Sequence, residues 1–459
     1  MIGQAPIPTP ELALEPLLPE LALCVFAIVG LLYEAFSPRP ERIVHLAIGL
    51  LGVGLAAATS LWLWGWDGAP VVLAGSVAAD RFAVLARLLL LAVAALGLLL
   101  GHQYFRRSGD EAKGEFTPLL LFATAGMTLI AAAADLIVTF LALEILSLSL
   151  YVLTGLTGRR AANEASMKYF LLGAFSSAFF LYGVAMAYGA TGTTKIPALA
   201  TALTGGSERG LALLAFALLA VGFAFKVSAA PFHMWTPDVY QGAPTPVTAF
   251  MSAATKVAAF AALIRVLDVA FQALAWDWAP IVWALAAISI VLGSVLAIAQ
   301  TDVKRMLAYS SIAHAGFILT GLTAPGAQGI RSALFYLVAY AATTVGAFAT
   351  VMVVSGRGEE RTRLDDYRGL GRSDPIAAAL MTLFLLSLAG IPPAAGFIAK
   401  VTVFSAALAA GHWDLVLIGV LASVAAAFFY LRVIVLMYMQ EPEDASATET
   451  DESRAPAGA

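Results

Sequence analysis

The sequence predicts an all-α fold, a polytopic membrane helix bundle. Of its 459 residues, 61% are hydrophobic and only 12% are charged. The mean hydropathy is +0.87. Apolar stretches recur along almost the whole length, and each can cross a hydrocarbon core of about 30 Å with about 20 helical residues. One continuous bundle therefore fits this chain better than a string of globular domains.

Hydropathy predicts thirteen membrane helices. They cover residues 15–36, 43–64, 81–104, 117–134, 136–156, 166–190, 210–238, 244–270, 279–300, 304–324, 330–355, 374–411 and 414–439. The seventh and the twelfth are too long for one crossing and contain proline, which removes a backbone donor and interrupts a helix. We therefore expect both to be broken helices, as in ion transporters.

Two groups of five helices repeat along the chain. Helices 4 to 8 begin near residues 117, 136, 166, 210 and 244, and helices 9 to 13 begin near 279, 304, 330, 374 and 414. The spacing between matching helices is nearly constant, and a broken helix has the same place in both groups. Because five is odd, the second group enters the membrane from the opposite side. We predict N-terminal helices in residues 1–116, a first repeat in 117–270 and an inverted second repeat in 271–440.

The charges near helix ends predict the orientation of the bundle. One side has fourteen basic residues, namely Arg39, Arg42, Arg106, Arg107, Lys113, Arg159, Arg160, Lys304, Arg305, Arg357, Arg361, Arg363, Arg368 and Arg372. The other side has five, namely Arg81, Lys195, Arg209, Arg265 and Arg331. Since basic loops stay in the cytoplasm, we expect the N-terminus outside and the C-terminus inside the cell.

Composition excludes several kinds of function. Lys and Arg are spread over short loops and the net charge is only −4, so no basic face for nucleic acid is expected. The single cysteine, Cys24, cannot by itself form a disulfide, a four-cysteine zinc site or an iron–sulfur cluster. No glycine-rich nucleotide fingerprint joins a strand to a helix. Residues 441–459 contain six acids and one arginine, which predicts a disordered cytoplasmic tail.

Four ionisable residues are predicted to lie at membrane depth next to helix centres or helix breaks: Glu144, Lys226, Lys256 and Lys400. A lysine at a helix centre costs about 3 kcal/mol on insertion scales, so it needs a partner, a hydrated cavity or a function. A Glu144–Lys226 ion pair that only fixes helix packing is one interpretation of the first two. For Lys256 and Lys400 the sequence offers no obvious acidic partner, which favours a function for them.

Proline places unbonded carbonyls close to these lysines. Pro231 frees the carbonyl of Val227, while Pro392 and Pro393 free two carbonyls that include that of Ala389. Unbonded carbonyls in lipid are prohibitively unfavourable, so each break is expected to line a hydrated cavity within the bundle. Both broken helices therefore bring polar backbone near a buried lysine.

Other polar residues are secondary candidates. His233 is spaced to relay protons, and a hydrogen-bonded structural histidine is the alternative. Lys168 is a candidate as well, although a lysine near a helix end can simply extend its ammonium to the surface. Ser252, and Ser310 with His314, form short polar stripes that either hold water or satisfy backbone groups.

Three segments carry a resemblance to a known family. They are NEASMKYFLLGAFSSAFFLYGVAMAYGATG (163–192), PFHMWTPDVYQGAPTPVTAFMSAATK (231–256) and DVKRMLAYSSIAHAGF (302–317). They resemble the N-type antiporter-like subunits of bacterial NADH-quinone oxidoreductase (respiratory complex I) and, more distantly, subunits of multisubunit cation/proton antiporters. The resemblance implies a proton-transfer line of Glu144, Lys226, Lys256 and Lys400, with Lys168 and His233 in accessory roles. N-type subunits usually continue into a fourteenth helix where this chain enters its acidic segment.

The resemblance also implies a function and partners. We expect a proton-translocating, non-redox subunit of the bacterial inner membrane, driven by quinone reduction in partner subunits. NADH, FMN, iron–sulfur clusters and quinone are then expected in those partners, with no cofactor in this chain. A cation/proton antiporter subunit or a hydrogenase-linked pump is the first alternative, and an inactive membrane scaffold is the second. The buried charges argue against the scaffold, and neighbouring genes distinguish the first alternative.

Overall fold

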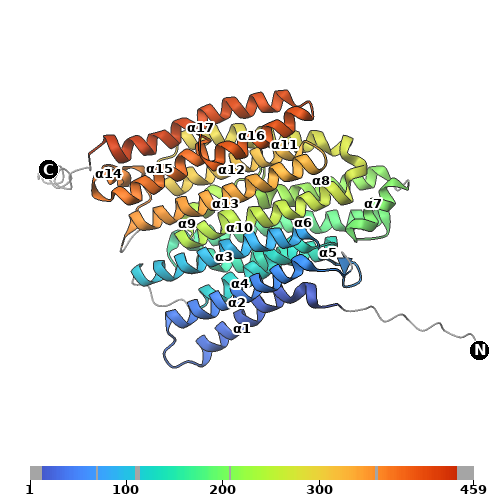
Figure 1. The fold of residues 1–459 in the computed structure, drawn as a ribbon, viewed down its shortest axis with the longest axis horizontal. Coiled ribbons are helices and arrows are strands. Elements are labelled where there is room, and N and C mark those ends of the chain that lie inside the picture. The colour runs from blue at the N-terminus through green and yellow to red at the C-terminus, as the bar shows by residue number, and fades with distance from the viewer. Residues whose placement is uncertain (1–12, 69–70, 109–113, 206–207, 357–359, 442–459) are drawn as a thin grey trace, which may run out of the picture.

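In the computed structural model, long helices lie side by side and follow a common direction along the molecule (Figure 1). The structure describes residues 13–68, 71–108, 114–205, 208–356 and 360–441. The N-terminal end and all of the predicted tail beyond residue 441 lie outside the described residues.

Seventeen α-helices and one hairpin follow one another in the described chain. They are α1 (Leu18–Phe36), α2 (Arg42–Trp62), β1 (Val71–Val72), β2 (Val77–Ala78), α3 (Arg81–Ser108), α4 (Phe116–Ala132), α5 (Leu136–Gly155), α6 (Arg160–Thr191), α7 (Ile196–Thr204), α8 (Arg209–Val227), α9 (Trp235–Gly242), α10 (Thr245–Arg265), α11 (Ala275–Ile298), α12 (Val303–Leu322), α13 (Ala327–Ser355), α14 (Leu370–Ser373), α15 (Pro375–Ala389), α16 (Ala395–Ala409) and α17 (Trp413–Met439). The strands pair antiparallel. The order is completed by the 3₁₀ helices η1 (Glu15–Leu17), η2 (Leu63–Gly65), η4 (Gln272–Leu274) and η5 (Leu364–Tyr367), and by the π-helix η3 (Val266–Ala270).

The architecture confirms the predicted membrane helix bundle. Among the described residues, ten helices are long and apolar enough to cross a membrane, and α4, α15 and α16 are shorter apolar helices. Both predicted broken helices are present, as α8 with α9 and as α15 with α16. The number of thirteen crossings stays a prediction. Hydropathy missed the hairpin and α7, because two-residue strands and a nine-residue helix are too short to give a membrane signal.

The two halves of the chain contain the same polar contact at corresponding places, and we call each contact a clasp. In the first, Asp135 caps α5, accepts a bond from Thr194 Oγ1 at 2.9 Å and forms a β-bridge with Lys195. In the second, Asp302 caps α12, accepts from Thr362 Oγ1 at 2.5 Å and forms a β-bridge with Arg363. The clasps lie at the offset that the helix spacing predicts.

The clasps lie at opposite ends of the bundle. The first directly precedes α7 and the second directly precedes η5 and α14, and Figure 1 shows α7 and α14 at opposite ends. The two broken helices also run in opposite directions there. Five predicted crossings separate corresponding elements, and an odd number of crossings would place them at opposite ends of the bundle.

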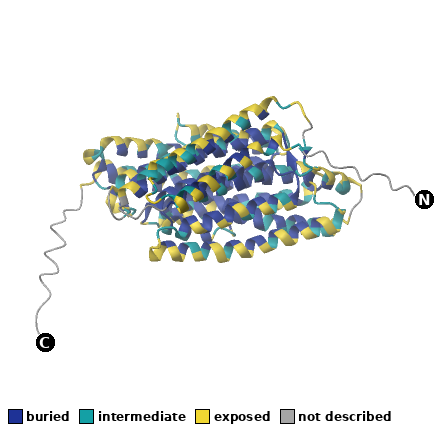
Figure 2. Cartoon of the chain, turned by 90° about the horizontal axis from the view of Figure 1, so that it is seen from below, coloured by how far each residue is buried: buried dark blue, intermediate teal, exposed yellow. Residues whose placement is uncertain are grey.

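Helix α10 lies at the centre of the bundle. All residues from Thr245 to Ile264 are buried, and the helix packs against α3, α4, α8 and α13. Figure 2 shows buried residues in the interior and exposed residues along the outer helices. Many of the exposed residues are large and apolar, such as Leu55 on α2 and Val424 on α17, as expected for a surface that faces lipid. Lys256 on α10 therefore has little contact with solvent or lipid.

Candidate functional site

Lys226 lies on the last turn of α8, beside the middle of α5. Its side chain is buried, and its ammonium donates to Ser147 Oγ at 2.7 Å. Ser147 in turn donates to the backbone carbonyl of Leu143. Three aromatic rings, those of Tyr151, Tyr169 and Phe225, have their centres 5.6 to 5.7 Å from the ammonium. Cation–π attraction at such distances offsets part of the cost of burying the charge.

Glu144 is half-buried on the same helix face as Ser147, about one turn away. Its carboxylate accepts a hydrogen bond from Ser177 on α6. In the part of the chain that the structure describes, Glu144 and Lys226 form no ion pair. Ser147, rather than Glu144, is the hydrogen-bond partner of the ammonium in this conformation. Ser147, which accepts from Lys226, therefore lies on the same helix as Glu144, about one turn away.

The first broken helix is interrupted after Val227. Ser228 takes the left-handed conformation with φ +62°, and Pro231 has no backbone N–H to continue the helix. The carbonyl of Val227 accepts from Lys256 Nζ at 2.6 Å. Lys256 is fully buried, at 0% exposure. The carbonyl that the sequence predicts to be free is therefore the partner of the central lysine.

The second broken helix has the same construction. Helix α15 ends at Ala389, and the carbonyl of Ala389 accepts from Lys400 Nζ at 2.9 Å. Ser423 Oγ accepts a second bond from the same ammonium at 3.2 Å, and the Phe317 ring centre lies 4.6 Å away. Because the C-terminal end of a helix carries partial negative charge, both lysines lie where an ammonium is stabilised.

A cluster of tyrosine, serine and histidine side chains lies between the surroundings of Lys256 and those of Lys400. The Tyr340 ring is 5.9 Å from the Lys256 ammonium, and its hydroxyl donates to Ser311 Oγ at 2.9 Å. His314 Nδ1 lies 2.7 Å from the Tyr336 hydroxyl. On the other side, the ring of His314 lies 5.9 Å from that of Phe317, which contacts Lys400.

The sequence reasoning missed the tyrosines of this cluster. Tyr430 on α17 completes it, bonded to Ser310 and 3.3 Å from His314 Nε2. Ser310 and His314 were expected as a polar stripe, and their partners are these hydroxyls. The only available signal was Tyr336 and Tyr340 four residues apart on one helix face. Tyrosine is common in apolar helices, so that signal is weak.

The accessory candidates lie apart from this line. Lys168 Nζ is 2.8 Å from both Glu164 and Asp238, and its side chain is 43% exposed. Instead of simply extending to the surface, Lys168 joins α6 to α9 through Asp238. His233 is half-buried in the break between α8 and α9, and its Nδ1 has no hydrogen-bond partner among the described residues. The structure brings neither residue into contact with Lys226.

Two further buried ion pairs were not predicted from the sequence. Arg87 is fully buried on α3 and pairs with Glu20 on α1, with Nε 2.9 Å from Oε1. Lys304 is fully buried on α12 and pairs with Glu360 at 2.8 Å. Arg87 and Glu20 were visible as charges in apolar segments, whereas Lys304 was placed in a cytoplasmic loop because it begins a helix.

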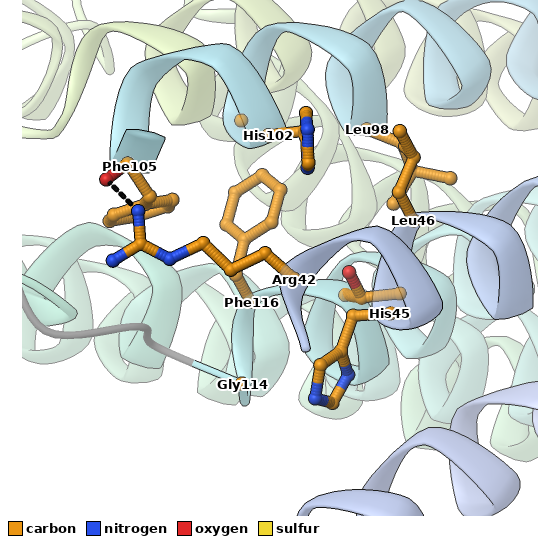
Figure 3. Close-up of a pocket in the computed structure, with 10 residues that line it drawn as sticks. Arg42, His45, Leu46, Leu98, His102, Phe105, Gly114 and Phe116 are labelled. Carbon is orange, nitrogen blue, oxygen red and sulfur yellow. Dashed lines mark hydrogen bonds between the residues drawn. The ribbon is translucent and has the colours of Figure 1, made fainter. Parts of the chain in front are cut away.

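A pocket opens between α2, α3 and the start of α4 (Figure 3). It encloses about 400 Å³, including space open to solvent, and its lining includes Arg42, His45, His102 and Phe116. Arg42 donates to the carbonyl of Phe105 at its edge. None of its lining residues belongs to the buried lysine line. Among the described residues, no three His, Cys, Asp or Glu side chains gather as a metal site would require.

Comparison with known proteins relates the chain to respiratory membrane subunits. The family model described as "NADH:quinone oxidoreductase/Mrp antiporter, TM" matches residues 133–426. NADH-quinone oxidoreductase subunit N of Acidothermus cellulolyticus is 47% identical over 95% of this chain and 89% of that protein. Subunit N of Trichlorobacter lovleyi is 46% identical over 94% of this chain and 88% of that protein.

Solved structures show the same fold. A chain of respiratory complex I from Thermus thermophilus with bound aureothin has a TM-score of 0.77 and 39% identity, covering 93% of this chain and 91% of that one. A chain of the Mrp complex from Dietzia has a TM-score of 0.82 at 24% identity, covering 94% of this chain and 82% of that one. At that identity the Mrp likeness concerns the fold alone.

Proposed function

Since this chain belongs to the subunit N family of NADH-quinone oxidoreductases (respiratory complex I), we propose that protons cross it along Glu144, Lys226, Lys256 and Lys400. The chain is a membrane subunit of a proton-translocating oxidoreductase, and its partners are the other membrane subunits and the NADH-oxidising arm. It acts within an enzyme without performing the redox step. NADH, FMN, iron–sulfur clusters and quinone belong to the partner subunits in this proposal.

One observation carries the proposal. Lys256 and Lys400 each donate to the last carbonyl of a broken helix, at Val227 and at Ala389. A carbonyl dipole stabilises a buried ammonium less than a carboxylate does, so the proton can leave without breaking an ion pair. Purely structural lysines would be better served by a carboxylate partner. The arrangement is therefore suited to loading and releasing protons.

The polar cluster gives the line continuity in its second half. Hydroxyls of Tyr340, Tyr336 and Tyr430, with Ser311 and His314, occupy the space between the two lysines. Hydroxyl and imidazole groups both donate and accept hydrogen bonds, as a proton relay requires. Water molecules at the helix breaks would bridge the remaining gaps between these polar groups.

We place the two repeats and the termini in this proposal as well. Residues 117–270 and 271–440 are the two half-units, each with one broken helix, after N-terminal helices in 1–116. The N-terminus faces the outside and the C-terminus the cytoplasm of a bacterial inner membrane. The opposite placement of the two clasps supports the inverted arrangement, and the loop charges support the orientation.

The antiporter alternative is less well supported. Identity to subunit N proteins reaches 47% over most of the chain, whereas identity to the Mrp chain is 24%. The inactive scaffold is disfavoured because Glu144, Lys226, Lys256 and Lys400 are all present. The identity to subunit N also favours complex I over a hydrogenase-linked pump.

Replacing each central lysine tests the proposed path. We expect Lys256→Met and Lys400→Met to abolish most proton uptake per NADH oxidised in membrane vesicles, because methionine keeps the length of the side chain but carries no proton. Lys195→Met, at an exposed position before α7, is the matched control and should pump normally. A native gel must show assembly of the complex. Normal uptake by an assembled Lys256→Met or Lys400→Met complex contradicts the path.

A further inference from the structure

The second half of the first broken helix, α9, is held at both ends by consecutive residues of α12. Arg305 Nη1 lies 2.6 Å from Asp238 Oδ1 in the first turn of α9 and 3.1 Å from Gln241 Oε1. Lys304 Nζ donates to the carbonyl of Ala243, the C-cap residue of α9, at 2.6 Å. A cation at a helix C-terminus is favourable, and so is an acid in the first turn. Two adjacent residues therefore fix the position of a short helix.

Lys304 is also tied to the following helix through Glu360. The two charges are 2.8 Å apart, and the other carboxylate oxygen of Glu360 accepts from the backbone N–H of Thr245, the first residue of α10, at 3.0 Å. Burial raises the pKa of Glu360, but the Lys304 charge and the hydrogen bonds outweigh it and keep the pKa below its usual value. The Glu360 carboxylate is thus ionised where α9 meets α10.

The repeat shows that this ion pair is not needed to build a clasp. Lys304 lies two residues after Asp302, and Glu360 lies two residues before Thr362. The corresponding positions in the first clasp are Ile137 and Gly192, which carry no charge. A buried ion pair contributes little net stability compared with apolar side chains of similar size. Its presence in one half alone therefore points to a task specific to that half.

We propose that Lys304 and Arg305 are positioning residues for proton transfer, acting as an inter-repeat clamp on α9. The clamp keeps α9 and the break before it aligned with the Val227 carbonyl that holds Lys256. Because α12 also carries Ser311 and His314, a shift of α9 is passed to the polar cluster of the second half. The positioning role rests on the proposed function, whereas the clamp itself is a structural claim.

Removing both charges of the buried pair tests the clamp. Lys304→Met with Glu360→Gln leaves no lone buried charge, so the complex should assemble. Amide hydrogen exchange in α9 should become about tenfold faster or more, while exchange in α5 stays unchanged. Proton uptake per NADH oxidised should fall in the same vesicles. The matched control is Arg372→Met with Glu441→Gln, an exposed ion pair that should change neither readout.

Arg305 supplies a second, independent test, because it is only partly buried and tolerates replacement more readily. Arg305→Met should loosen α9 and lower proton uptake, and Arg305→Lys, which keeps a cation for Asp238, should restore most of both. The clamp is overturned if amide hydrogen exchange in α9 is unchanged both in Lys304→Met with Glu360→Gln and in Arg305→Met. A loosened α9 with full proton uptake overturns the positioning role. The proposed proton path is tested by a different result: it is contradicted if assembled Lys256→Met or Lys400→Met complex takes up protons normally.

Discussion

At the scale of single residues, the three buried lysines of the line share one property. Each ammonium contacts an uncharged oxygen: Ser147 Oγ for Lys226, the Val227 carbonyl for Lys256 and the Ala389 carbonyl for Lys400. A hydrogen bond to a charged group contributes about 1.5–3 kcal/mol to stability. Removing one partner of a buried ion pair destabilises a protein by more, about 3–5 kcal/mol. On the proposed path, these bonds order the lysines and still allow each of them to release a proton.

Ser147 is the most direct test at this scale. Ser147→Ala removes the hydrogen-bond acceptor of the Lys226 ammonium, so proton loading at Lys226 should weaken. Proton uptake per NADH should fall in vesicles that hold the assembled complex. Ser149→Ala on the same helix is the control, because Ser149 bonds only to the carbonyl of Ile145. Equal uptake by the two variants would argue against a role for the serine.

At the scale of helices, close contacts between α4 and α5 and between α11 and α12 set the geometry of each half. A Cβ on Gly126 would lie 2.7 Å from Leu146 N and 2.8 Å from Ala142 O. A Cβ on Gly293 would lie 2.5 Å from Ala313 N and 2.7 Å from Tyr309 O. These neighbours are backbone atoms, which cannot move without shifting a whole helix. Both halves thus depend on glycine at the same crossing.

Gly126→Ala and Gly293→Ala should each destabilise the subunit, by about 1–3 kcal/mol as for other overpacked sites. The measurement is the thermal denaturation midpoint of the purified complex, followed by the release of this chain. Gly54→Ala on α2 is the control, because a Cβ there meets nothing within 4 Å. It should be neutral or slightly stabilising, since alanine favours a helix more than glycine does. A midpoint for Gly126→Ala equal to that of Gly54→Ala contradicts the packing account.

The helices also show what the sequence could and could not predict. Proline is a local cause, so both breaks and the freed carbonyls of Val227 and Ala389 followed from the sequence. The sequence did not predict which lysine donates to each carbonyl. The donor to Val227 is Lys256 from another helix, whereas the donor to Ala389 is Lys400 from the second part of the same broken helix. The sequence also could not decide whether Glu144 or Ser147 contacts Lys226, since the two residues lie one helical turn apart on α5. Side-chain partners depend on packing that hydropathy does not describe.

At the scale of the whole molecule, the proposed inverted repeat would place equivalent parts at opposite ends of the bundle. The clasps at Asp135 and Asp302 occupy the two ends, and the broken helices run in opposite directions. On this proposal, one half would open toward one side of the membrane and the other half toward the other side. The central helix α10, with Lys256, lies between them, as a path through both halves requires.

The orientation can be tested with cysteine tags at both ends of the chain, after the native Cys24 is replaced by serine. An impermeant thiol reagent on intact cells should label the N-terminal tag only, because basic loops on the side of Lys304 and Arg363 stay in the cytoplasm. Labelling after the membranes are opened shows that the second tag is reactive. Labelling of the C-terminal tag alone on intact cells would reverse the proposed orientation.

The central claim is that Lys226 carries a proton that it must release. The most direct measurement is proton uptake by vesicles that contain assembled Lys226→Arg complex, compared with wild type and with Lys226→Ala. A guanidinium keeps its proton at any physiological pH, so arginine preserves the charge but cannot release the proton. The account predicts that Lys226→Arg pumps as poorly as Lys226→Ala. Full pumping by assembled Lys226→Arg would contradict it and leave a structural charge as the better explanation.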